Sequence, residues 1–257
     1  MGSEMCIRDR FLPGDTGTQE EALRRIVNQK LGPAVLARAA WWEQELRREL
    51  TMGLKQVLLL GAGLESLPCR QTAEMERMSF YEVDTPVVLA EKEKRLREVG
   101  ITTPRNVYRV GVDLAEDWEK TLLEMTPFAT EQRTLTALLG VVYYLPRAAM
   151  EALLKRLAAI TPRGSSLLFD CPMRDFGTGE DAAGQQRALA KGAGEAMEQG
   201  YTLPELALML ERHGFLIYED MGPREITERF YARYNETHPE SPVLPLPGTA
   251  LVLAARH

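Results

Sequence analysis

A short apolar run that meets two glycines is the feature of this sequence that most constrains its fold. Residues 56–60 read QVLLL, and Gly61 and Gly63 follow at once. A buried parallel strand that turns into a helix beside a nucleotide-like ligand has this form. A second run, residues 79–83, ends in Asp84 about twenty residues later, where a strand-tip carboxylate can accept hydrogen bonds from ribose hydroxyls. Together the two runs predict a site for an adenosine-type cofactor.

From the first run onward, apolar runs alternate with segments of helical periodicity. This alternation predicts an α/β fold in which a parallel sheet has helices on both faces. We expect the last two strands to form an antiparallel edge, because a long Pro-rich segment, residues 239–247, connects them. The expected strands are 56–60, 80–83, 107–110, 134–139, 165–170, 215–219 and 249–254. The expected helices are 20–30, 33–50, 65–77 (with a loop), 86–99, 118–125, 146–160 and 204–213.

Length and composition point away from nucleic-acid and membrane partners. The chain has 257 residues, 45% of them apolar, and a formal net charge of −6, which gives no global basic field for a nucleic-acid backbone. No apolar run approaches the ~20 residues of a membrane helix, and no secretion signal is visible. The cysteines Cys6, Cys69 and Cys171 show neither disulfide nor zinc spacing. A cytoplasmic protein without nucleic-acid or membrane partners is therefore expected.

We expect one domain over residues 1–257, because no linker divides the chain. Residues 1–15 lack periodicity and are predicted to be a disordered or non-native leader. Residues 16–52 are predicted to form a helical N-terminal extension. Residues 177–200 are rich in Gly, Ala, Gln and charge, and are predicted to be an insertion or lid near the substrate.

The glycine pattern leaves two cofactor classes open. A dinucleotide site is expected to show G-x-G-x-x-G, but the third position after Gly61 and Gly63 is Ser66. A nicotinamide-dependent oxidoreductase stays an alternative. S-adenosylmethionine is favoured, because a short glycine loop needs only to let the backbone approach one nucleoside and its amino-acid tail. Asp113 and Leu114, after the third strand, can in addition hold the adenine edge.

Four segments carry a more specific signal. In order they are 56–66 (QVLLLGAGLES), 81–84 (YEVD), 113–114 (DL) and 141–146 (VVYYLP). They resemble the leucine carboxyl methyltransferase family, which includes protein phosphatase carboxyl methyltransferases and bacterial polyketide carboxyl O-methyltransferases. The resemblance runs from about Val35 to the C-terminus. It implies a Rossmann-like class I S-adenosylmethionine-dependent methyltransferase fold, with a mostly parallel seven-stranded sheet and an antiparallel edge strand.

Carried over by position, the resemblance implies how S-adenosylmethionine is bound. Gly61 and Gly63 approach the methionine part of the cofactor. Asp84 binds the ribose hydroxyls. Asp113 and Leu114 contact adenine.

Some residues have alternative roles that stay open. Arg38 resembles a family arginine that pairs with the cofactor carboxylate through its two-pronged fork, but a helical arginine is often a surface ion-pair residue. Asp113 could instead cap a helix. Glu82 points to the same side of its strand as Asp84, and we expect one of the two, preferably Glu82, to be only a solvated strand-end charge. Tyr144 either lines the substrate pocket or packs in the core.

Two positions depart from the family pattern. The family has a glutamate before the Gly-Val-x-Tyr-Tyr-like segment, which holds the cofactor's ammonium group, whereas this chain has Leu139. Phosphatase-specific members have an arginine after the Asp-Leu pair, where this chain has Ala115. The first departure leaves open a catalytically weakened or inactive relative. The second argues against a phosphatase tail as the substrate.

The function predicted from these residues is transfer of a methyl group to oxygen, on a carboxylate of a small molecule. A carboxylate is ionised at neutral pH and needs no general base, so no catalytic acid–base residue is identified. The histidines His213, His238 and His257 form no cluster with metal-ligand spacing, and no metal is expected.

Overall fold

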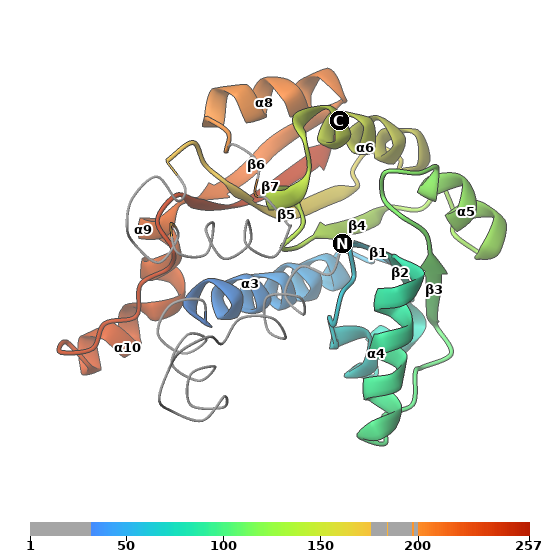
Figure 1. Ribbon diagram of the computed structural model, residues 1–257, viewed down its shortest axis with the longest axis horizontal. Coiled ribbons are helices and arrows are strands. Elements are labelled where there is room, and N and C mark those ends of the chain that lie inside the picture. The colour runs from blue at the N-terminus through green and yellow to red at the C-terminus, as the bar shows by residue number, and fades with distance from the viewer. Residues whose placement is uncertain (1–31, 176–183, 185–196, 198–199) are drawn as a thin grey trace.

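The computed structural model describes residues 32–175, 184, 197 and 200–257 of the chain. Its centre is a seven-stranded sheet with the strand order β3-β2-β1-β4-β5-β7-β6, and helices lie on both sides of it (Figure 1). The strands are β1 (Gln56–Leu60), β2 (Ser79–Asp84), β3 (Val107–Gly111), β4 (Thr134–Leu138), β5 (Ser166–Pro172), β6 (Phe215–Met221) and β7 (Thr249–Arg256).

The strands β1 to β5 are parallel, and the strand order reverses at β1. From β1 the chain moves outward through β2 to β3, and then returns to the other side of β1 with β4. Ligands of open α/β sheets bind beyond the carboxyl ends of the strands at such a reversal. The tips of β1, β2 and β4 are therefore where a cofactor site is expected.

The predicted antiparallel edge is confirmed. β7 runs antiparallel to both β5 and β6, and this pair completes one side of the sheet. β7 lies between β5 and β6, and β6 is the outermost strand on this side of the sheet.

Two apolar clusters fill the space between the sheet and its helices. On one face lie α5 (Trp118–Met125), α6 (Arg147–Ile160) and α8 (Leu203–Arg212). On the other lie α3 (Gly32–Thr51) and α9 (Pro223–Ile226). Buried strand residues alternate between the clusters: Tyr81 faces the first, and Phe80 faces the second.

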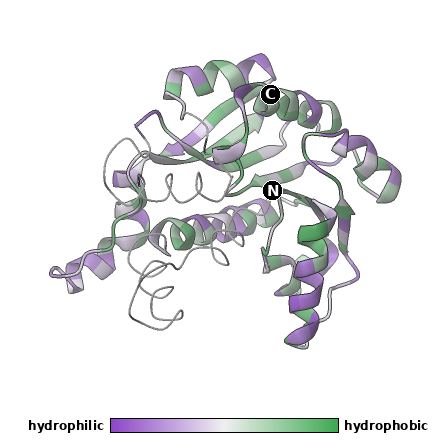
Figure 2. Ribbon diagram, viewed as in Figure 1, coloured by the Kyte–Doolittle hydropathy of each residue, from purple (hydrophilic) through white to green (hydrophobic). Residues whose placement is uncertain are grey.

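The helix α4 (Pro86–Glu98) covers β2 and β3 on the same side of the sheet as α3 (Figure 1). The helices that pack on the sheet are amphipathic, whereas α10 (Ala232–Thr237) is mostly hydrophilic (Figure 2). The hydrophilic surface of α10 agrees with its lack of buried residues.

The segment after the glycine loop differs from the prediction. Instead of an α-helix within residues 65–77, the structure has two single-turn 3-10 helices, η2 (Leu67–Cys69) and η3 (Met75–Arg77). The side chain of Asn106, which precedes β3, donates to the carbonyl oxygens of Met75 and Met78 at 3.2 and 2.8 Å. In a continuing α-helix these two carbonyl oxygens would instead accept from the amides four residues later.

The Pro-rich connection before β7 is preceded by helical turns that were not predicted. They are α9, the π-helical segment η5 (Thr227–Tyr231) and α10. The predicted helix at 20–30, the predicted leader and nearly all of the predicted insertion at 177–200 lie outside the described residues. No described helix combines the length and apolar character needed to cross a membrane.

Candidate functional site

The glycine loop after β1 is fixed by its backbone and by a close neighbour. Gly61 and Gly63 have φ angles of +69° and +48°, in the left-handed region that favours glycine. The amides of Gly61 and Ala62 both donate to the carbonyl of Val83, at 2.9 and 3.2 Å. A Cβ on Gly61 would overlap the side chain of Val141, which follows β4. The loop after β1 therefore lies tightly against the loop after β4.

Asp84, the last residue of β2, points at this glycine loop. One carboxylate oxygen accepts from the amide of Gly63 at 2.8 Å, and the other accepts from the amide of Thr85 at 2.7 Å. The residue is 5% exposed. Burial raises the pKa of Asp84, and the two backbone hydrogen bonds oppose that rise. A carboxylate offers about four acceptor sites, so these two bonds leave capacity for ligand hydroxyls.

Glu82 is not the solvated charge that was expected, and that prediction is wrong. Its side chain is fully buried. Lys92 of α4 and Arg109 of β3 reach its two oxygens, at 2.7 and 2.9 Å. Because β2 pairs with β3 so that Glu82 lies opposite Arg109, the sheet register itself brings this pair together. Glu82 therefore anchors α4 and β3 to the centre of the sheet.

Asp113 and Leu114 lie just beyond the carboxyl end of β3, next to Asp84. The amide of Val112 donates to the backbone carbonyl of Asp84 at 2.9 Å and ties this loop to the tip of β2. The carboxylate of Asp113 accepts from the amide of Ala115 at 2.9 Å. Asp113 does not cap a helix, because α5 begins at Trp118. The loop places both predicted adenine contacts at the carboxyl ends of the strands, the same end of the sheet as the glycine loop.

Arg38 lies on α3, and its guanidinium reaches the carboxylate of Asp170 at the carboxyl end of β5, 2.9 Å away. Only 14% of the Arg38 side chain is exposed. The amide of Gly140 donates to the other oxygen of Asp170 at 2.6 Å. Arg38 is thus an ion-pair residue, but in a buried cluster at the tips of β4 and β5 and not on the open surface. Asp170 was not recognised as a site residue, although it ends a predicted buried strand in the same way as Asp84.

The tyrosines after β4 lie beside this cluster. Tyr143 is buried in the single-turn helix η4 (Val142–Tyr144), and burial, then the charge of Asp170, raises the pKa of its phenol while Arg38 opposes the rise. Tyr144 is half-buried and packs against a small cluster that contains Tyr143 and Leu246. Its place in a substrate pocket stays a prediction.

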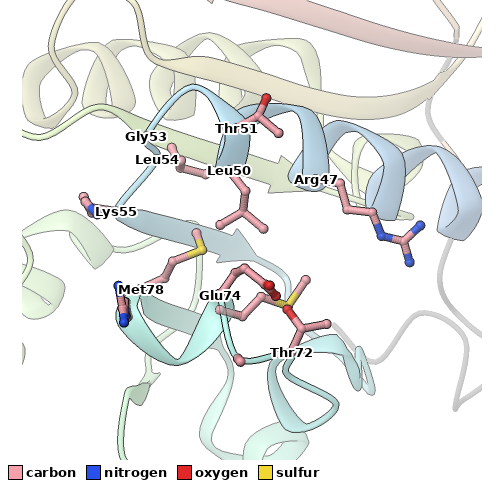
Figure 3. Close-up of a pocket in the computed structure, with 12 residues that line it drawn as sticks. Arg47, Leu50, Thr51, Gly53, Leu54, Lys55, Thr72, Glu74 and Met78 are labelled. Carbon is pink, nitrogen blue, oxygen red and sulfur yellow. The ribbon is translucent and has the colours of Figure 1, made fainter.

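A cavity of about 610 Å³ opens elsewhere, at the opposite end of β1. It lies between the end of α3 and the segment around η3, and Leu54, Lys55 and Met78 are among its lining residues (Figure 3). Lys55 immediately precedes β1, whereas Gly61 follows it. This cavity is therefore separate from the glycine loop. Within the part of the chain that the structure describes, no group of His, Cys, Asp and Glu could hold a metal ion.

Comparison with known proteins agrees with this arrangement. The sequence profile described as leucine carboxyl methyltransferase matches residues 7–158. A candidate S-adenosyl-L-methionine-dependent methyltransferase of Bacillus subtilis, YktD, is 32% identical over 217 residues, which cover 83% of this chain and 71% of that protein.

Two solved structures share the fold. A candidate methyltransferase from Thermobifida fusca superposes with a TM-score of 0.65 at 17% identity, over 99% of this chain and 95% of that one. NcsB1, an O-methyltransferase from neocarzinostatin biosynthesis, was solved with S-adenosylmethionine and 2-hydroxy-5-methyl naphthoic acid. It superposes with a TM-score of 0.50 at 14% identity, over 79% of this chain and 49% of that one.

Proposed function

Since the chain belongs to the leucine carboxyl methyltransferase family and is an S-adenosylmethionine-dependent methyltransferase of the class I fold, we propose that it methylates a carboxylate oxygen of a small molecule. The observation that carries the cofactor part of the proposal is the buried carboxylate of Asp84, which accepts from the backbone amides of Gly63 and Thr85 at the carboxyl end of β2, beside the point where the strand order reverses. An acceptor in this place suits the hydroxyls of an adenosyl group.

The other residues around the tips of the strands fit the same cofactor. Asp113 and Leu114 stand at the neighbouring strand end, where adenine contacts are proposed. Gly61 and Gly63 present backbone without side chains to the methionine part. Arg38 supplies a guanidinium, which suits a carboxylate because its planar fork can donate two charge-assisted bonds.

The reaction needs little from the protein beyond alignment. The bound cofactor supplies a methyl group that its sulfonium makes electrophilic, and an ionised carboxylate is already a nucleophile. The residues of this chain then have to bind both partners, orient them and exclude water. Orientation of this kind can contribute up to about 7–11 kcal/mol. No general base is required, and none is assigned here.

The carboxylate acceptor is inferred from the family, and a small molecule is preferred to a protein tail. The position that carries an arginine in phosphatase-specific members is Ala115 here, and its amide is bonded to Asp113. NcsB1, with the same fold, was solved with a small aromatic acid.

The test is methyl transfer from radiolabelled S-adenosylmethionine to a panel of small carboxylic acids, followed by mild base. Methyl esters release methanol under these conditions, whereas methyl ethers and N-methyl products do not. Base-labile label supports the proposal. Label that survives base would contradict carboxylate as the acceptor, although methyl transfer itself would stand.

A catalytically weakened relative is the second candidate, and Leu139 is the observation that favours it. This half-buried side chain packs on the α3 side of the sheet, where the family places a glutamate for the cofactor ammonium. Cofactor affinity measured by calorimetry separates the candidates. A weakened relative would show weak binding and no methyl transfer to any acid in the panel.

A further inference from the structure

A buried carboxylate, Asp170, stands one strand away from the position at which the family glutamate is missing. Asp170 is 3% exposed and lies in β5, the outermost of the parallel strands on this side of the sheet, near its carboxyl end. β4 and β5 pair so that Leu138 lies opposite Phe169. Leu139 follows Leu138 and Asp170 follows Phe169, so Leu139 and Asp170 are neighbours where the two strands end.

The two side chains also share one face of the sheet. Leu168 belongs to the apolar cluster on the α3 side, and Asp170 follows it by two residues, so it points the same way. Leu139 packs against that same cluster. A carboxylate is thus present on the face and at the level where the family glutamate would stand, but it comes from β5 instead of β4.

The carboxylate is held together with a cation. Its oxygens accept from the amide of Gly140 at 2.6 Å and from the guanidinium of Arg38 at 2.9 Å. Gly140 has a φ of +72°, and a Cβ there would come within 2.9 Å of the Arg38 guanidinium. With no side chain at Gly140, the guanidinium lies directly beside the end of β4 and forms an ion pair with Asp170 there.

We propose that Asp170 supplies the carboxylate that position 139 lacks: it receives the ammonium group of the cofactor's methionine tail and orients Arg38 toward the tail's carboxylate. The tail of S-adenosylmethionine carries both charges on one carbon atom. An adjacent carboxylate and guanidinium match such a zwitterion, since each protein charge meets its opposite. This inference rests on the proposed function and explains how the chain can bind the cofactor despite Leu139.

The competing role is purely structural. In that case Asp170 only braces α3 against the sheet through Arg38, and it makes no contact with the ammonium group. The two roles can be distinguished by the ligands that Asp170 affects. If Asp170 is purely structural, its removal does not weaken the binding of a ligand through that ligand's ammonium group.

The experiment is calorimetric titration of wild-type protein and Asp170→Asn with three ligands. S-adenosylhomocysteine has the full tail, its decarboxylated form keeps only the ammonium, and methylthioadenosine lacks the tail. We expect Asp170→Asn to weaken the first two by about 10- to 100-fold, the range of a hydrogen bond to a charged group, and to leave methylthioadenosine unchanged. Unchanged binding of the decarboxylated ligand would overturn the proposal in favour of the brace.

A gain-of-function variant adds a second arm. Leu139→Glu placed on Asp170→Asn restores a carboxylate on the same face, and should recover part of the lost affinity for the ammonium-bearing ligands. Asp220→Asn is the matched control, because it removes an exposed carboxylate from β6 in the same sheet. It is expected to change none of the three affinities.

A comparison of ligands on wild-type protein tests the proposal even if the variants fail to fold. The decarboxylated ligand should bind wild-type protein about 10- to 100-fold more tightly than methylthioadenosine does, and equal affinities would overturn the proposal without any variant. If wild-type protein binds none of the ligands, the proposed function fails. If it binds S-adenosylhomocysteine and Asp170→Asn binds it equally well, only the inference about Asp170 fails.

Discussion

Glu82 and Asp84 are two acidic residues on one face of one strand, and the structure treats them in opposite ways. Glu82 meets two cations, Lys92 and Arg109, within 2.9 Å. Asp84, two residues further on, is held by two backbone amides. The difference shows that an acid in the strand interior is compensated by side-chain charges, whereas an acid at the strand tip is positioned by the loop and keeps acceptor capacity for a ligand.

The comparison separates stability from binding. Removing one member of a buried ion cluster leaves the opposite charges buried and uncompensated, which is costly to folding. Removing an acceptor that faces a ligand costs binding instead.

Glu82→Ala is expected to lower the free energy of unfolding by about 3–5 kcal/mol, because Lys92 and Arg109 would remain buried without their partner. Urea denaturation followed by circular dichroism measures the change. The protein that stays folded should bind S-adenosylhomocysteine with nearly unchanged affinity. A stable variant with lost binding would reverse the roles assigned to the two acids.

Gly61→Ala is expected to cost roughly 2–4 kcal/mol, since it combines a left-handed backbone with an overlap against Val141. Gly63→Ala is the matched control: its backbone is also left-handed, but the nearest atom to a new Cβ is 3.9 Å away. Its cost should be only about 1–2 kcal/mol. Adding Val141→Ala should restore part of the stability of Gly61→Ala and none of that of Gly63→Ala, and equal costs for the two glycines would contradict the tight contact.

Asp84→Asn is expected to weaken S-adenosylhomocysteine binding by about 1.5–3 kcal/mol, the range of hydrogen bonds to a charged group. The ligand's 2′-deoxy form provides the control, because an effect that acts through the ribose hydroxyls should shrink when one of them is removed. Calorimetry of both proteins with both ligands gives the coupling. An equal loss for the two ligands would place the contact elsewhere.

The smallest expected effect is a pH dependence. Burial raises the pKa of Asp84 in the folded protein above the unfolded value of about 3.9. The protonated carboxyl group therefore contributes its full stabilisation below the unfolded pKa. This contribution is lost as the pH rises through the folded pKa. Asp84→Asn lacks the titration. Wild-type protein should therefore lose stability relative to Asp84→Asn as the pH rises above about 4, in unfolding experiments on ligand-free protein. A relative gain over this window would show that the backbone amides outweigh burial.

Much of the fold could be predicted from the sequence, because the information was local. Apolar runs bounded by Gly and Pro define β1, β2 and β4, and proline at the first turn marks where α4 begins. The irregular path after Gly63 could not be predicted, since it depends on Asn106, a residue distant in the sequence that takes the carbonyls of Met75 and Met78.

The candidate site shows the same division. The glycine loop and Asp84 are readable because each ends a strand in a recognisable way. The burial of Glu82 could not be predicted from the sequence, because one of its partners lies on α4 and the other is brought opposite it by the register of β3. The link between Arg38 and Asp170 joins residues 132 positions apart, and no local pattern encodes it. An acid at the tip of a buried strand is a signal that could have drawn attention to Asp170 as it did to Asp84.

The most direct test of the central claim, that the glycine loop and Asp84 hold an adenosyl group, is a calorimetric titration of wild-type protein with S-adenosylhomocysteine. The account predicts saturable binding that Asp84→Asn weakens and Asp220→Asn leaves intact. Absence of both heat and a thermal shift at millimolar ligand, in protein shown to be folded, would contradict it.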